Sequence, residues 1–185
     1  MLFKLMFPGV IFHELAHYLA CMLVGVKVYS VKLFDSKEAF VQHANPTTPQ
    51  AIVISLAPFA LNNVLGIWLL FFANELLLFY NPISLFFYWL AISLLFQSFP
   101  SDTDAMNSFT AARHALTKRL KHGKPLTRAA WLILSPIIFL PVLFLTGLLL
   151  VFDKSTFLKV LWLIAILLLS FDPGTAIAAI NNFFI

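Results

Sequence analysis

The stretch VIFHELAHYLA, residues 10–20, decides the fold class and the chemistry expected of this chain. It places His13, Glu14 and His17, three side chains that can bind a metal ion or accept a proton near neutral pH, among mostly apolar residues. Residues four apart on a helix share one face, so both imidazoles can reach one metal ion, with the glutamate beside its bound water. Zinc lowers the pKa of such a water to about 7 and polarises carbonyl groups. The motif therefore predicts a Zn²⁺ site with His13 and His17 as ligands and Glu14 as the catalytic base.

The rest of the chain is also strongly apolar. Of its 185 residues, 61% are hydrophobic and only 11% are charged. Soluble domains are nearer half apolar and a quarter charged, so the polar side chains here are too few to cover a soluble surface. The same shortage argues against a disordered chain and against a nucleic-acid partner. The composition predicts an integral membrane protein in contact with the lipid bilayer.

Several apolar stretches have the length of about 20 residues that a bilayer-crossing helix needs. We expect an all-α polytopic membrane protein with about five transmembrane helices, forming a single domain over residues 1–185. The expected spans are residues 3–26, 50–72, 82–99, 129–152 and 157–180.

The segment between the first two spans has the composition of a short β-hairpin. Residues 26–34 are rich in β-branched side chains, and residues 39–43 form a second candidate strand after a turn. With five spans, nine Lys and Arg residues fall on the side of this segment and of residues 100–128, and three fall on the other side. Basic loops are retained in the cytoplasm, so we expect a multi-pass membrane protein whose site is reached from the cytoplasmic side.

A zinc ion needs a further ligand from another part of the chain. Cys21 follows His17 by four residues, but a straight helix cannot bring a third turn to one tetrahedral ion, so Cys21 is expected to be a buried core thiol. The acidic candidates are Asp102, Asp104 and Asp172. We favour Asp102 or Asp104, because about 1.5 Å per helical residue places Asp102 and His17 at similar depths.

Two further polar pairs have alternative interpretations. Ser101 and Asp104 fit a capping pair that opens a helix, which is compatible with one aspartate capping while the other binds metal. Asn62 and Asn63 lie near the level of the motif in the second expected span. They either hydrogen-bond a neighbouring helix or act in catalysis, where one of them orients the substrate carbonyl or stabilises the oxyanion.

Taken together, these motifs resemble those of the site-2 protease family, the intramembrane zinc metalloproteases. The resemblance rests on residues 13–17 (HELAH), the β-like segment, residues 56–58 (LAP) followed by Asn62, and residues 100–102 (PSD). It implies Asp102 as the aligned third ligand and Asn62 or Asn63 as the supporting amide. The sequence departs from the family pattern at Ala57, where glycine is usual, and the asparagine is displaced by one residue.

The resemblance implies an intramembrane zinc metalloendopeptidase that cleaves peptide bonds in or near transmembrane segments of membrane-anchored proteins. The shortness of the chain implies a minimal member without a PDZ domain, in a prokaryotic cell membrane. The alternative is a non-proteolytic membrane protein of the same fold that binds metal or partner helices.

Overall fold

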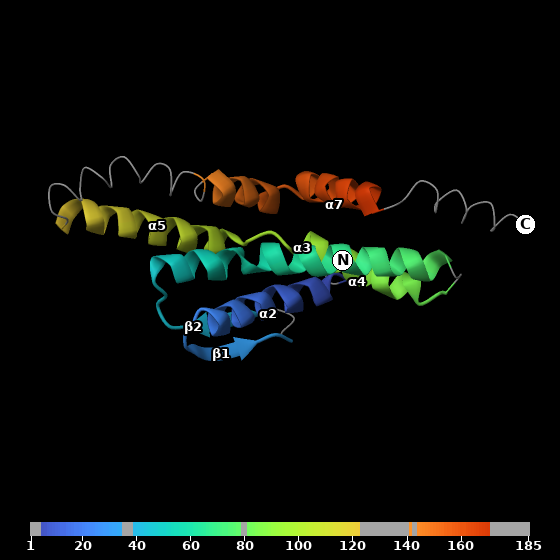
Figure 1. Cartoon of the computed structure of the whole chain (residues 1–185), viewed down its shortest axis with the longest axis horizontal. Helices are drawn as coiled ribbons and strands as arrows, with labels where there is room; N and C mark the ends of the chain where they lie inside the picture. Colours follow the sequence, from blue (N-terminus) through green and yellow to red (C-terminus); the bar gives the residue numbers. More distant parts are fainter. Residues whose placement is uncertain (1–4, 35–38, 79–80, 123–140, 142–143, 171–185) are drawn as a thin grey trace, which may run out of the picture.

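The computed structural model describes residues 5–34, 39–78, 81–122, 141 and 144–170 (Figure 1). This part of the chain contains six helices and one pair of strands. In chain order they are α2 (Phe7–Leu23), β1 (Val28–Lys32), β2 (Phe40–His43), α3 (Thr48–Leu78), α4 (Ser84–Phe96), α5 (Asp102–His122), residues 144–154 and α7 (Thr156–Ser170).

The long helix α3 is the centre of the fold, and α2, α4, α5 and α7 all pack against it (Figure 1). The main core lies between α3, α4 and α7, where Leu70, Leu94 and Leu95 have no exposed surface. Gly66 permits close packing here, because a Cβ atom at that position would lie 2.7 Å from the Leu95 side chain. The N-terminal half of α5 lies along the start of α3, and the N-terminal turn of α5 lies beside α2 (Figure 1).

Helix α2 approaches the backbone of α4 at Gly9, four residues before the first histidine of the motif. A Cβ atom on Gly9 would lie 2.0 Å from the Ser93 carbonyl oxygen, so only glycine fits. The Ser93 Oγ accepts a hydrogen bond from the Gly9 N–H at 2.8 Å and donates one to the Met6 carbonyl at 2.9 Å. These contacts hold the start of α2, and with it the motif, against α4.

The expected hairpin is confirmed as an antiparallel pair in which Lys32 lies opposite Phe40 and Val28 opposite His43. Helix α2 ends before it at Leu23, and the chain leaves the helix through Gly25, whose φ of 72° is the left-handed conformation that glycine adopts readily. The Val26 N–H donates to the Cys21 carbonyl at 2.8 Å and the Gly25 N–H to the Met22 carbonyl at 3.3 Å, as in a Schellman cap. This stop turns the chain into β1.

The expectation of about five transmembrane helices is wrong for the described residues, where one helix, Thr48–Leu77, is long and apolar enough to cross a membrane. Helices α2 and α4 have 17 and 13 residues, and α7 has 15. At about 1.5 Å per residue these reach roughly 20–26 Å, short of the ~30 Å of bilayer hydrocarbon. The expected spans at 129–152 and 157–180 lie partly outside the described residues.

A helix cap and a buried hydrogen-bonded amide explain why the ends of the apolar stretches differ from the observed ends of α2 and α3. The Schellman cap stops α2 at Leu23, inside the expected span 3–26. Conversely, α3 continues past the expected end at residue 72, because its polar Asn74 is satisfied by neighbouring helices. The Asn74 Nδ2 donates to the Ser170 carbonyl at 2.7 Å, and its Oδ1 accepts a hydrogen bond from the Tyr88 hydroxyl.

Candidate metal centre

Both motif histidines lie on α2 and each is held by a backbone carbonyl from another helix. The His13 Nδ1 lies 2.9 Å from the Gln97 carbonyl oxygen, just after α4, and the His17 Nδ1 lies 2.8 Å from the Ile54 carbonyl oxygen in α3. A carbonyl oxygen can only accept, so each Nδ1 carries the ring proton when the imidazole is neutral. Each Nε2 is then left with the lone pair that a metal ligand needs.

Asp104 reaches the histidines from the first turn of α5, where a capping box orients it. Its Oδ2 accepts hydrogen bonds from the Ser101 N–H at 2.9 Å and the Ser101 hydroxyl at 2.7 Å. In return, the Asp104 N–H donates to the Ser101 Oγ at 3.3 Å. The capping pair expected from the sequence is therefore confirmed, and the capping carboxylate itself faces His13 and His17.

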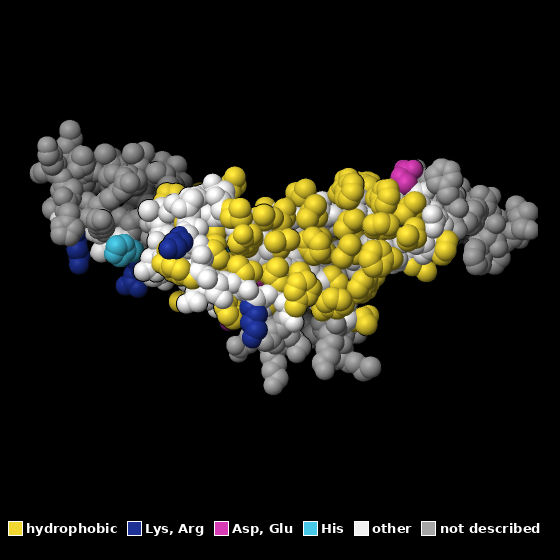
Figure 2. Space-filling view, turned by 90° about the horizontal axis from the view of Figure 1, so that it is seen from below, with side chains coloured by type: hydrophobic (Ala, Val, Ile, Leu, Met, Phe, Trp, Pro, Cys, Tyr) yellow, Lys and Arg dark blue, Asp and Glu magenta, His cyan; other side chains and the backbone are white. Residues whose placement is uncertain are grey.

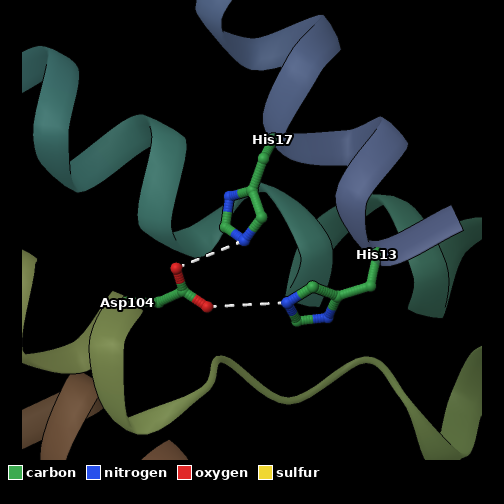
Figure 3. A group of neighbouring side chains, drawn as sticks. All are labelled: His13, His17 and Asp104. Atoms are coloured by element: carbon green, nitrogen blue, oxygen red, sulfur yellow. Dashed lines mark ion pairs between the residues drawn. The ribbon is translucent and has the colours of Figure 1, made fainter. Parts of the chain in front are cut away.

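The three side chains converge on one point (Figure 3). The Asp104 Oδ2 lies 3.5 Å from the His13 Nε2, and the Asp104 Oδ1 lies 3.3 Å from the His17 Nε2. The candidate ligand atoms of the three residues all lie within 4.8 Å of one another. Ligands at about 2.0–2.1 Å from a tetrahedral Zn²⁺ are separated by roughly 3.3–3.4 Å, so each histidine lies at a suitable distance from one of the two Asp104 oxygens.

The charge state of Asp104 also suits a ligand. Burial alone would raise the pKa of this carboxyl. When the His13 and His17 imidazoles are protonated, their Nε2–H groups donate to Asp104 and their positive charges attract it, which holds the Asp104 pKa well below the usual range. A bound metal ion would take the place of the two Nε2 protons. The carboxylate is therefore ionised at neutral pH. Two imidazoles and one carboxylate, with each imidazole held at its other nitrogen, are a donor set that fits Zn²⁺ and leaves a fourth position open.

A cavity of about 900 Å³ adjoins these side chains. Glu14, His17 and Asp104 are among the residues that line it. Residues of β2, of the start of α3 and of α5 as far as His114 form the rest of its wall. The glutamate of the motif thus faces the same space as two of the candidate ligands.

The other acidic candidates do not join this group among the described residues. The Asp102 side chain is 62% exposed and lies 3.5 Å from the Lys154 ammonium, so it is engaged outside the histidine pair. Asp172 lies outside the described residues. Cys21 is fully buried as expected, in a small cluster with Ala20 and Ile54.

Neither predicted asparagine is among the residues that line the cavity. Asn62 is fully buried and its Nδ2 donates to the Gln97 carbonyl at 3.3 Å. Asn63 donates to the Phe59 carbonyl at 2.7 Å and accepts a hydrogen bond from the Trp162 indole at 3.0 Å. Asn63 thus joins α3 to α7, whereas Asn62 reaches the carbonyl that holds His13.

No pattern in the sequence points to Ile54 and Gln97, the two residues whose carbonyls hold the ligand histidines. They act through the backbone, so their side chains carry no signal of this role. The nearest signal in the sequence is Pro58, which lies inside an apolar helix four residues after Ile54.

No family model, no curated protein and no solved structure matches this chain. The resemblance to the site-2 proteases therefore remains a prediction from the motifs.

Proposed function

We propose that the chain is an integral membrane zinc metalloendopeptidase that hydrolyses peptide bonds of membrane-anchored proteins. One observation carries the proposal: His13, His17 and Asp104 come together from distant parts of the sequence, with both imidazoles presenting Nε2. A purely structural cluster does not require both histidines to be held at Nδ1 by carbonyls and to face one carboxylate.

The surface supports a membrane location. Large apolar side chains are exposed on α3 at Val64, Trp68 and Phe71, which follow one another at helical spacing and form an outward stripe. Apolar side chains cover the middle of the face in Figure 2, and the Lys, Arg and His side chains in view lie in one half of it, most of them toward one end. An apolar belt beside a basic end suits a protein in lipid whose basic end lies in the cytoplasm.

The residues around the cavity suit peptide hydrolysis. When bound, zinc would act as a Lewis acid that activates water and polarises the scissile carbonyl. Glu14 would take a proton from the attacking water and pass it to the leaving amine nitrogen as the C–N bond breaks. His13, His17 and Asp104 would hold the ion in place, and the cavity would admit water to a site otherwise enclosed by helices.

The cavity wall also suits an extended peptide. Strand β2 pairs with β1 on one side, and Phe40, Val41 and His43 of β2 line the cavity. A peptide that binds along β2 would gain main-chain hydrogen bonds and would be held in the extended form that cleavage needs. In this proposal the substrate runs along β2 toward Glu14.

Val41→Asp is expected to raise the KM for a membrane-anchored substrate about tenfold, a loss of about 1.4 kcal/mol of binding. The new carboxylate would stand on the wall along which the substrate runs. Val31→Asp is the matched control, because Val31 is the register partner of Val41 on β1 and is not among the residues that line this cavity. Equal KM values for the two variants would remove β2 from the substrate path.

Removal of the metal is expected to abolish cleavage. The purified protein, prepared without chelator and reconstituted in vesicles, should contain about one zinc per chain. A chelator should remove both the zinc and the cleavage of a co-reconstituted substrate, and added zinc should restore both. Wild-type protein that holds no zinc would overturn the proposal, whereas zinc bound without any cleavage would favour a metal-binding protein that is not a protease.

A further inference from the structure

We propose that Pro58 and Asn62 of α3 are positioning residues that prepare the two backbone carbonyls on which the ligand histidines depend. The inference rests on the proposed metal site. Neither residue is among those that line the cavity, and each acts through one carbonyl oxygen. Pro58 acts on His17 through Ile54, and Asn62 acts on His13 through Gln97.

Pro58 releases the carbonyl that holds His17. In an α-helix the N–H of each residue donates to the carbonyl four residues earlier, so the usual partner of the Ile54 carbonyl is the N–H of residue 58. Pro58 lies inside α3 and has no N–H, and its ring pushes against that same carbonyl. The Ile54 oxygen is therefore without its helical partner, and the His17 Nδ1 occupies it at 2.8 Å.

Asn62 acts on the carbonyl that holds His13. Gln97 caps the C-terminus of α4, where carbonyl groups have no partner within the helix. The Gln97 oxygen accepts from the His13 Nδ1 at 2.9 Å and from the Asn62 Nδ2 at 3.3 Å. Asn62 thereby ties this helix end to α3 and limits the directions in which the carbonyl can point.

A stabilising role explains neither residue. Proline inside a helix costs stability relative to alanine. Asn62 is fully buried, and its Oδ1 finds no hydrogen-bond partner in the part of the chain that the structure describes. A buried amide that is only half satisfied is unfavourable compared with an apolar side chain of the same size. Pro58 and Asn62 lie four residues apart on one face of α3, so a single helix face serves both histidines.

The test measures zinc affinity and thermal unfolding of the full-length protein for Pro58→Ala and Asn62→Leu. Chelator competition gives the zinc Kd, and the unfolding midpoint is measured on the metal-free form. Asn63→Leu is the matched control, because Asn63 is a buried neighbour of the same type whose partners are Phe59 and Trp162. Loss of an outer-sphere partner, a group that hydrogen-bonds a metal ligand, weakens metal binding by about 10–100-fold. The effect of Pro58→Ala should fall near the lower end of that range.

We expect Pro58→Ala to weaken zinc binding about tenfold while its metal-free unfolding midpoint stays equal to wild type or rises. Asn62→Leu should weaken binding about three- to tenfold, and the two losses should multiply in the double variant, because they act on different histidines. Weaker zinc binding without a loss of stability in Pro58→Ala would show that Pro58 positions the metal site and does not stabilise the fold. Zinc affinities equal to that of Asn63→Leu would overturn the inference, and a wild-type protein without zinc would overturn the proposed function instead.

Discussion

Glu14→Gln is expected to lower the cleavage rate by about 10²–10⁴-fold while the protein keeps its full zinc content. The amide has nearly the shape of the carboxylate but cannot accept the proton of the attacking water. Because His13, His17 and Asp104 supply the proposed ligands, the metal should remain bound. The measurement is single-turnover cleavage of a membrane-anchored substrate in vesicles, with zinc quantified in the same preparations.

Glu75→Gln provides the control for this prediction. Glu75 lies in α3 with its side chain exposed, and it is not among the residues that line the cavity. This variant should cleave at the wild-type rate. Unchanged cleavage by Glu14→Gln would remove Glu14 as the base and would favour the alternative of a membrane protein that binds metal without proteolysis.

Asp104→Asn is expected to weaken zinc binding by more than about 100-fold, beyond the loss caused by an outer-sphere partner. The substitution removes the negative charge that faces both imidazoles but keeps an amide oxygen able to accept the Ser101 hydrogen bonds. The helix cap is therefore preserved, and the change in affinity reports on the metal site. The measurement is chelator competition on the purified protein.

Asp102→Asn separates the two aspartates. Asp102 forms an exposed ion pair with Lys154, and such pairs contribute about 0–1 kcal/mol to stability. Loss of the Asp102–Lys154 ion pair should leave zinc affinity and cleavage unchanged. If Asp102→Asn released the metal and Asp104→Asn kept it, the assignment of the third ligand would be reversed.

The order of the residues predicted most of the local features of the site. The spacing of His13 and His17 predicts a shared helix face, and both lie on α2 facing one carboxylate. The Ser101–Asp104 spacing predicts a capping box, which the structure contains. Each of these features depends on residues within one or two turns of helix, so the sequence alone carries the information.

The number of spanning helices was mispredicted because apolar composition does not report where a helix stops. The cap at Gly25 shortens α2, and the hydrogen bonds of Asn74 with Tyr88 and Ser170 allow α3 to run through a polar position. Both effects depend on backbone conformation or on partners that are distant in the chain. A count of hydrophobic residues contains no information about backbone conformation or about distant hydrogen-bond partners.

The sequence by itself determined which functional groups stand close together along the chain: two imidazoles and a carboxylate at fixed helical spacing, in a chain of which only 11% is charged. Only the tertiary structure decided which aspartate meets the histidines, and which nitrogen of each ring faces that aspartate instead of a backbone carbonyl. Those choices depend on the packing of α2 against α3, α4 and α5. This packing brings the carbonyls of Ile54 and Gln97 and the carboxylate of Asp104 to the two histidines, which lie 37–91 residues earlier in the chain. Spacing along one helix fixes the face on which a ligand lies, whereas contacts between helices depend on how all their surfaces fit together.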